Sequence, residues 1–350
     1  MGRNLKKRRG NQMAKSKNIF DELTEQYEDV KLGAGAEVPA WIHSGSYALN
    51  KVMSGNYFAG YPCGRIIEFF GDPSTGKSLL IYEAMANFQK QYGEHAYVIL
   101  DDTEDVFTES MAKLLEIDTK RIILLGSETV EEHFGKIFLG MKEVDEDGGK
   151  SKKKEGLVPF ILSKDPEAKF LVALDSVAML STVHEKEVLF EKDDMTKAKK
   201  LRAGLRMVNK CFVSEYNILY LIANHVIAQI NSYGGGKSTP GGKAIPFMSS
   251  VRLDLSMDEK IKVGKEKDDK VIGIRTLCLA KKNKIAAPFV KAYLDIYFEK
   301  GLDEMSGLVD LLVEDGLLRT RGSGVFEDAK GDKFRKGEMT LERLKSIVVQ

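Results

Sequence analysis

The stretch Gly71-Asp72-Pro73-Ser74-Thr75-Gly76-Lys77-Ser78 fits the pattern G-x4-G-K-[ST], and it decides the fold. An apolar run, Ile66 to Phe70, precedes it, and an amphipathic segment, Ser78 to Gln91, follows it. Glycines let backbone N–H groups turn inward around phosphate oxygens, and a helix N-terminus adds partial positive charge. We therefore expect a phosphate-binding loop, in which Lys77 reaches the β- and γ-phosphates of ATP and the Ser78 hydroxyl ligates Mg²⁺.

Acidic residues follow two further apolar runs. Asp175 ends the run that begins at Phe170, the pattern expected of a carboxylate that holds the metal, mostly through its water shell. Phosphoryl transfer to water also needs a carboxylate that orients the attacking water. Glu104 is the candidate and Asp102 the alternative, although acid clusters of this kind are by themselves more often solvated loops.

The order of segments predicts the fold class. Short apolar runs alternate with stretches of helical periodicity, such as Ile81, Ala84, Met85 and Phe88. Near-continuous apolar strands that alternate with helices indicate a parallel sheet covered on both faces, hence an α/β core. The predicted strands are 66–70, 97–100, 122–125, 170–174 and 218–223.

Three domains are expected. Residues 1–40 would hold a basic arm and a short amphipathic helix over Phe20 to Val30, residues 41–300 the core, and residues 301–350 a small helical end domain. Two charged segments have little to bury. We expect Lys142 to Gly156 to be a mobile surface insertion, and Met257 to Lys270 to join two antiparallel strands.

Composition excludes several classes of protein. With 43% hydrophobic residues, the 350-residue chain can bury a core,. No run approaches the roughly 18–20 apolar residues of a membrane-spanning helix. The basic start continues into polar residues, which does not fit a secretory signal. Cys63, Cys211 and Cys278 are too few and too scattered for a disulfide framework,. We expect a cytoplasmic protein without a membrane partner.

Charge is unevenly distributed. Residues 1–17 hold seven of the 53 Lys and Arg and none of the 52 acidic residues, which leaves 46 basic residues in the remainder. A mildly acidic body does not attract a polyanion as a whole, so nucleic-acid binding must come from local basic loops. The arm itself is either a solvated tail or a DNA contact.

The chain resembles the RecA family of recombinases over nearly its whole length. KNKIAAPF is the most specific match, because a P-loop ATPase in general does not need it. The resemblance implies a RecA-like P-loop ATPase core with a mostly parallel sheet, a short N-terminal helical oligomerisation segment and a small C-terminal domain. The matching motifs are GDPSTGKS (71–78), DTE (102–104), ALDS (173–176), YLIANH (220–225), TPGGKAIPF (239–247), SVRLD (250–254), KNKIAAPF (282–289) and GLVDL (307–311).

The resemblance implies roles for single residues. Glu104 would be the general base, and Asn224 and His225 would lie on the strand that senses the nucleotide. Lys282 and Lys284 would reach across a subunit interface to the γ-phosphate of a neighbour. Their spacing independently places both cations on one face of an extended strand. Adjacent like charges repel unless an anion neutralises them. The phosphates of ATP would supply this anion at the interface, so ATP would stabilise the contact between subunits in a filament.

The implied partners are single-stranded DNA, double-stranded DNA and further copies of the chain. The loop Ile230 to Lys243 has the glycines, hydroxyls, lysines and aromatic residue that suit contact with a DNA backbone,. A first DNA loop would fall near residues 184–195, but it is acidic, so the lysines and arginines after it would supply the positive charge unless they form a solvated helix face. The candidates are Lys199, Arg206, Lys237, Gly241, Gly242 and Lys243.

Some features depart from the family pattern. His225 stands where bacterial RecA has glutamine, the chain ends at Gln350 without a long acidic tail, and the insertion and the basic arm are atypical. These departures indicate a divergent member, and a virus-encoded origin is compatible with them.

Two other functions remain open beside the leading prediction, an ATP-dependent DNA recombinase that forms filaments on single-stranded DNA and catalyses strand exchange. A ring-forming helicase or DNA-processing ATPase would share the phosphate machinery but would not need KNKIAAPF. A non-catalytic, nucleotide-gated filament scaffold would not need Lys77, Ser78, Glu104 and Asp175 to be intact.

Overall fold

The computed structural model describes residues 18–26, 37–143, 152–188, 196–228, 237–264 and 269–349. The chain forms two compact units, Met1–Val38 and Pro39–Gln350. The first contributes helix α1 (Ile19–Gln26), which confirms the predicted N-terminal helix up to Gln26. The rest of that prediction and the basic arm fall outside the described residues. The division into three domains stays a prediction, and all that follows concerns the second unit.

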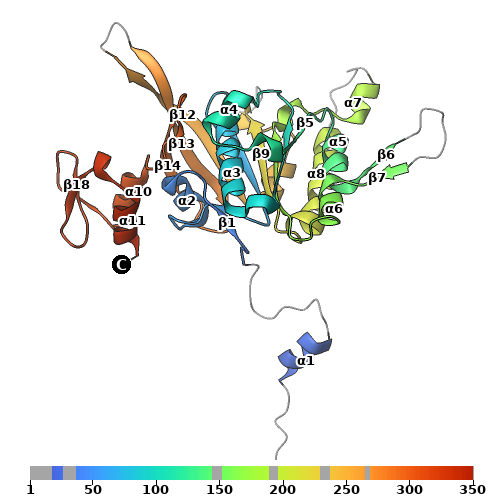
Figure 1. Ribbon diagram of the computed structural model, residues 1–350, viewed down its shortest axis with the longest axis horizontal. Helices are drawn as coiled ribbons and strands as arrows, with labels where there is room; N and C mark the ends of the chain where they lie inside the picture. Colours follow the sequence, from blue (N-terminus) through green and yellow to red (C-terminus); the bar gives the residue numbers. More distant parts are fainter. Residues whose placement is uncertain are drawn as a thin grey trace, which may run out of the picture. The chain divides into compact units, whose positions relative to one another are not determined.

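A central sheet runs through the second unit in the order β15-β14-β13-β12-β3-β9-β8-β4-β5 (Figure 1). The strands from β12 to β5 are mutually parallel, and β13, β14 and β15 continue the sheet antiparallel. All five predicted apolar strands lie in its parallel part, which confirms the α/β fold class. The bounds are β3 (Arg65–Gly71), β4 (Ala96–Asp102), β5 (Ile122–Leu125), β8 (Lys169–Asp175), β9 (Leu219–His225), β12 (Val251–Val263), β13 (Lys270–Asn283), β14 (Lys291–Tyr297) and β15 (Gly301–Leu302).

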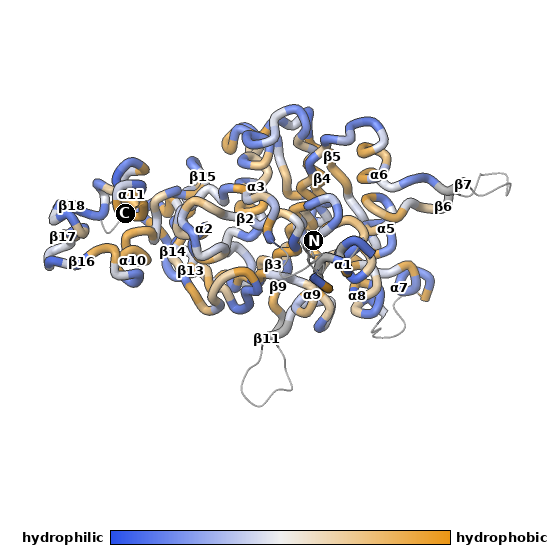
Figure 2. The backbone as a smooth tube through the Cα atoms, turned by 90° about the horizontal axis from the view of Figure 1, so that it is seen from below, coloured by the Kyte–Doolittle hydropathy of each residue, from blue (hydrophilic) through white to orange (hydrophobic). Residues whose placement is uncertain are grey.

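Two hydrophobic cores lie on the two faces of this sheet. Successive side chains of a strand point to opposite faces, so Leu219 and Leu221 join one core while Tyr220 and Ile222 join the other,. Figure 2 shows that hydrophobic stretches fill the middle of this unit and hydrophilic ones its peripheral turns. Helices α2 (Tyr47–Ser54), α3 (Lys77–Tyr92) and α4 (Glu109–Leu114) contribute to the first core, and α5 (Val130–Phe134), α6 (Leu157–Leu162), α8 (Thr196–Val208) and α9 (Ala244–Met248) to the second.

The segment Met257 to Lys270 joins two antiparallel strands, β12 and β13, as predicted. The strands are longer than expected, however: β12 continues to Val263 and β13 begins at Lys270, so most of the segment belongs to a long hairpin. Side chains of opposite charge form ion pairs along this hairpin: Arg275 lies 2.6 Å from Glu259, and Lys262 lies 3.6 Å from Asp269. A solvated two-stranded ribbon needs no apolar face, so its sequence resembles that of a loop.

The C-terminal region contains more than the helices that we predicted. Helices α10 (Leu308–Glu314) and α11 (Leu341–Val348) pack their leucines into the first core. Between them lies a three-stranded sheet of β16 (Arg319–Thr320), β17 (Val325–Glu327) and β18 (Lys333–Arg335), which the sequence analysis missed. Strands of two or three residues are too short to show an alternating pattern.

The expected insertion has paired ends. Strands β6 (Met141–Glu143) and β7 (Lys152–Lys154) are antiparallel, and residues 144–151 between them lie outside the described part. The remaining short elements are β1 (Trp41–Ile42), β2 (Tyr61–Pro62), α7 (Val183–Glu187), β10 (Ile227–Ala228), β11 (Lys237–Ser238) and the single turns η1 (Gly93–His95), η2 (Thr119–Arg121), η3 (Gly135–Leu139), η4 (Val177–Met179), η5 (Asn209–Val213) and η6 (Lys336–Glu338).

Candidate active site

The glycine-rich loop joins β3 to α3, as predicted. Its two glycines are required by geometry. A Cβ on Gly71 would lie 2.0 Å from the carbonyl oxygen of Leu255, and Gly76 has a φ of +92°, which other residues rarely adopt,. The Thr276 hydroxyl donates a hydrogen bond to the carbonyl oxygen of Thr75 at 3.1 Å, so the neighbouring strand β13 also holds the loop.

Lys77 lies inside this loop. Its Nζ donates hydrogen bonds to the carbonyl oxygens of Gly71 (3.1 Å) and Asp72 (2.8 Å). Burial lowers the pKa of Lys77, and the negative charges of Asp175, Glu104 and Asp72 partly oppose this effect,. The ammonium group is therefore held inside the loop by two backbone carbonyl oxygens.

Glu104 is fixed by two neighbours. Its Oε1 accepts hydrogen bonds from the Ser176 hydroxyl (2.6 Å) and pairs with His225 Nε2 (2.9 Å). Burial alone would raise the pKa of Glu104, but the hydrogen bonds from Ser176 and His225, helped by the charge of Lys77, bring it below its usual value. Glu104 is thus a carboxylate at neutral pH.

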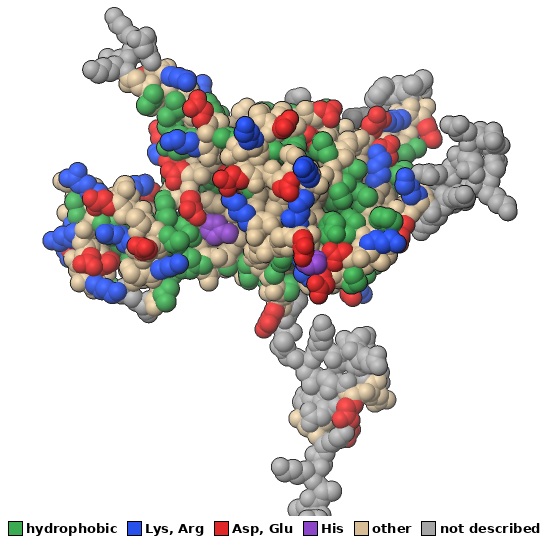
Figure 3. Space-filling view, in the orientation of Figure 1, with side chains coloured by type: hydrophobic (Ala, Val, Ile, Leu, Met, Phe, Trp, Pro, Cys, Tyr) green, Lys and Arg blue, Asp and Glu red, His purple; other side chains and the backbone are tan. Residues whose placement is uncertain are grey.

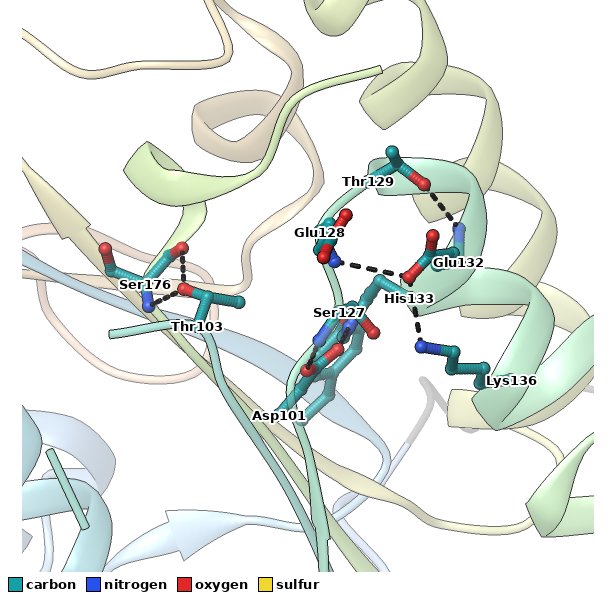
Figure 4. A network of polar contacts seen from close by, with 10 residues as sticks. Asp101, Thr103, Ser127, Glu128, Thr129, Glu132, His133, Lys136 and Ser176 are labelled. Atoms are coloured by element: carbon teal, nitrogen blue, oxygen red, sulfur yellow. Dashed lines mark hydrogen bonds and ion pairs between the residues drawn. The ribbon is translucent and has the colours of Figure 1, made fainter. Parts of the chain in front are cut away.

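A short backbone connection sets the position of Glu104. The Thr103 hydroxyl donates to the carbonyl oxygen of Ser176 and accepts from its N–H, both at 2.8 Å, as Figure 4 shows. These bonds join the ends of β4 and β8. The alternative candidate, Asp102, is buried, and its Oδ2 accepts a hydrogen bond from the N–H of Phe107 at 2.8 Å. Asp102 therefore holds the backbone turn, whereas Glu104, unlike Asp102, lines the cavity at the glycine-rich loop.

Asp175 and Ser78 fit a divalent cation. Burial raises the pKa of Asp175 to about 6, an effect that a hydrogen bond with Ser78 counteracts in part. The Oδ2 atom of Asp175 is buried and has no hydrogen-bond partner in the described part of the chain. An orphaned carboxylate oxygen beside a hydroxyl, next to a phosphate-binding loop, is the donor set that Mg²⁺ prefers.

Most of the predicted nucleotide residues line one cavity of about 350 Å³, although Gly71 and Asp72 are not among its lining residues. The cavity is lined by Pro73, Ser74, Thr75, Gly76, Lys77, Ser78, Leu79, Glu104, Asp175 and His225. Asn224 is buried beside it, with its Oδ1 unpaired among the described residues. The roles of these residues stay predictions. Ser176 and Thr103 were not singled out, although both lie within the quoted motifs.

Lys282 and Lys284 lie elsewhere. Neither is among the lining residues of the cavity. Lys282 Nζ donates hydrogen bonds to the carbonyl oxygens of Pro246 (2.6 Å) and Phe247 (3.0 Å) at the end of α9. Burial, together with the positive charges of Lys284 and Arg252, lowers the pKa of Lys282 to about 8, against the opposing influence of Glu68. Neither lysine therefore lies at the chain's own cavity, and their role at a neighbour's site stays a prediction.

Some DNA candidates come together as well. Lys199 on α8 and Lys243, just before α9, line a second cavity of about 350 Å³ together with Arg202 and the exposed Phe247. Gly241 and Gly242 have positive φ values of +85° and +63°. Arg206 is exposed on α8, and Lys237 lies in β11, although its side chain is outside the described residues. Figure 3 shows acidic and basic side chains interspersed over the face it displays.

Comparison with known proteins decides the family. The RecA N-terminal domain family matches residues 27–137 and 162–303. Protein RecA of Acholeplasma laidlawii is 32% identical over 303 residues, covering 84% of this chain and 80% of the relative. The chain belongs to the RecA family. Protein RecA of Chloroherpeton thalassium is 31% identical over 319 residues (90% of this chain, 79% of the relative), and that of Malacoplasma penetrans 29% over 303 residues (86% and 81%).

This membership gives the chain a RecA-type recombinase role, which confirms the leading prediction of a recombinase. Identities near 30% also confirm that it is a divergent RecA. Residues 138–161, which contain the paired strands β6 and β7, lie outside the RecA family match. None of the helices that the structure describes has the length and apolar character required to cross a lipid bilayer.

Proposed function

We propose that this chain is a DNA-dependent ATPase that polymerises on single-stranded DNA and pairs that strand with a homologous duplex in the cytoplasm. The observation that carries the proposal is the position of Glu104. An ionised carboxylate, fixed by Ser176 and His225, lines the same cavity as Lys77 and the glycine-rich loop. A loop that only binds a nucleotide does not require such a carboxylate.

ATP would occupy this cavity. The N–H groups of the loop and the Lys77 ammonium would bind its phosphates, and Glu104 would orient a water molecule through Oε2, since both hydrogen bonds to Ser176 and His225 reach Oε1,. Ser78 and Asp175 would hold Mg²⁺. When bound, this ion supplies positive charge that offsets the charge developing on the phosphates.

The partners follow from the other clusters. Lys282 and Lys284 would bind the phosphates of the next copy's nucleotide, so that ATP joins copies into a helical filament. Lys199, Arg206, Lys243 and the loop 237–243 would contact the DNA backbone, and base pairing itself would test homology. Backbone contacts release counterions, so affinity for DNA should fall steeply as salt rises.

The test combines an ATPase assay with negative-stain electron microscopy, with and without single-stranded DNA and a non-hydrolysable ATP analogue. We expect DNA-stimulated hydrolysis and open helical filaments in the presence of the analogue. Closed rings would instead favour a helicase, and a zero rate of hydrolysis with DNA present would favour a scaffold.

A further inference from the structure

Glu68 is a fully buried carboxylate in the middle of β3, outside the phosphate-binding loop. Within the described residues it makes polar contacts with one side chain on either side of its strand. Oε2 accepts a hydrogen bond from Nε of Arg252 on β12, and Oε1 accepts one from Nδ2 of Asn224 on β9 at 3.0 Å. A buried charge is retained in a fold only when its partners satisfy it, so Glu68 fixes both side chains.

The contact with Asn224 leads toward the chain's own nucleotide cavity. Asn224 is followed by His225, which lines this cavity and pairs with Glu104. Asn224 Nδ2 also donates to the carbonyl oxygen of Pro240 at 3.2 Å, in the segment that leads to the DNA candidates Gly241 and Gly242. Glu68 therefore holds the side-chain amide of Asn224, which borders the nucleotide site and contacts Pro240 in the segment proposed to bind DNA.

The contact with Arg252 leads toward the two lysines. Arg252 lies 4.4 Å from the centre of the Phe70 ring, which fixes the guanidinium group beside Glu68. Among the charged groups acting on Lys282 in the described part of the chain, Lys284 and Arg252 lower its pKa and Glu68 raises it. Arg252 also stands opposite Lys282 in the register of β12 and β13, so Glu68, Arg252 and Lys282 lie on three neighbouring strands. The positive charge of Arg252, Lys282 and Lys284 suits an incoming phosphate.

We propose that Glu68 is a positioning residue that couples two nucleotide sites, the chain's own through Asn224 and that of the next copy through Arg252 and Lys282. The proposal rests on the proposed function, since it assigns the lysines to a neighbour's phosphates. A shift of β9 on nucleotide binding would move Asn224 against Glu68. The carboxylate would then change its distance to Arg252 and with it the charge offered to the next site.

The first test is made on the free chain without nucleotide. Labelling with acetic anhydride at a series of pH values, read by mass spectrometry, gives the pKa of the Lys282 amine. Glu68→Gln removes the carboxylate, so we expect that pKa to fall by about one unit, whereas Arg252→Gln should raise it by a similar amount. Loosened packing would shift the pKa of Lys282 in the same direction in both variants, so opposite shifts would have to come from the charges of Glu68 and Arg252.

Asp254→Asn is the matched control. Asp254 lies on the same strand as Arg252, two residues further, and pairs with Lys281 at 3.8 Å. Asp254 is not among the groups that shift the pKa of Lys282, so we expect this pKa to stay unchanged in the variant. An unchanged pKa in Glu68→Gln, or shifts of the same sign in the Glu68 and Arg252 variants, would refute the proposal.

The second test measures coupling. With single-stranded DNA present, the Hill coefficient of hydrolysis against ATP concentration should fall toward 1 in Glu68→Gln, while ATP binding to the free chain stays within about twofold, because the loop is intact. Asp254→Asn should keep the wild-type coefficient. A wild-type Hill coefficient in Glu68→Gln would refute the coupling, even if the pKa of Lys282 changes in this variant.

The buried charge left in a single variant can impair folding, so the double variant Glu68→Gln/Arg252→Gln completes the design. Removal of both partners costs less stability than removal of one. It should fold, restore the pKa of Lys282 to near its starting value and still lose the steep dependence on ATP. A wild-type chain without DNA-stimulated hydrolysis would overturn the proposed function instead, and the labelling result would then decide on the link between Glu68 and Lys282 alone.

Discussion

His225 Nε2 lies 2.9 Å from Glu104 Oε1, so one hydrogen bond joins the end of β9 to the catalytic candidate that follows β4. Histidine changes its charge between about pH 5 and 8, whereas glutamine keeps an amide donor at every pH. A protonated His225 would hold the Glu104 carboxylate more strongly and make it a weaker base.

We therefore predict that DNA-dependent ATP hydrolysis declines on the acid side and that His225→Gln removes this decline. The pKa of Glu104 lies below its usual value, so protonation of Glu104 does not account for a decline near neutrality. Hydrolysis rates of both proteins from pH 5.5 to 8.5 measure the effect. If the two profiles coincide, His225 does not control the base.

Lys77→Ala should reduce hydrolysis by at least about 100-fold, because the lysine provides the positive charge at the phosphates and a lost electrostatic donor commonly costs that much. Lys90→Ala is the control. Lys90 lies on the same helix, is largely exposed and pairs with Glu116 at 3.2 Å, so its loss should leave the rate within about twofold,. Near-normal hydrolysis in Lys77→Ala would show that this loop is not the ATP site.

The double variant Lys282→Ala/Lys284→Ala should lose hydrolysis and ATP-dependent assembly while the chain still folds. Both lysines lie outside the chain's own cavity, so nucleotide binding to the free chain should persist. Sedimentation with the non-hydrolysable analogue measures assembly, and circular dichroism checks the fold. Lys281→Ala, which removes the adjacent cation paired with Asp254, should assemble normally. Normal assembly of the double variant would remove the lysines from the interface.

A buried polar network predicts a stability effect. Asp101 Oδ2 pairs with His133 Nδ1 at 2.6 Å, and His133 Nε2 lies 2.5 Å from the Tyr220 hydroxyl; Figure 4 shows Asp101 beside His133. Burial would raise the pKa of Asp101, but its bonds to His133 and Ser127 bring it below its usual value. His133→Leu would leave the buried carboxylate with only its hydrogen bond from Ser127, at a cost of about 3 kcal/mol at pH 7,.

The lowered pKa of Asp101 determines how its contribution to stability changes with pH. Its stabilising contribution is present above the unfolded-state value, about 3.9, and is lost as the pH falls through the lower folded-state value. The difference in unfolding free energy between wild type and His133→Leu should therefore shrink from pH 7 to pH 3. Glu132→Gln on the same helix removes a partly exposed pair with Lys136 and should change stability by under about 0.5 kcal/mol,. A pH-independent difference would argue against an ionised Asp101 in this network.

The parallel strands and the glycine-rich loop could be predicted because their signals are local. Ile66 to Phe70 is apolar in an unbroken run, and the pattern after it needs only eight residues. The choice between Asp102 and Glu104 could not be made from the sequence, because it depends on which carboxylate the backbone turn at Phe107 engages.

Other features were missed because their partners are distant. Glu68 has no local signal: its partners Asn224 and Arg252 are 156 and 184 residues away. The β12–β13 ribbon resembles a linker in sequence, because its charged residues find their partners only across the hairpin.

The separation of Lys77 from Lys282 has a consequence for mixtures. In the proposed arrangement each copy contributes one half of two different catalytic centres. A substitution in either half therefore inactivates only the interface to which that half contributes, and the other interface of the same copy is unaffected. A Lys77→Ala chain blended with a Lys282→Ala/Lys284→Ala chain would then regain turnover, because in one of the two possible orders along the polymer the seam between the two types is entirely wild-type.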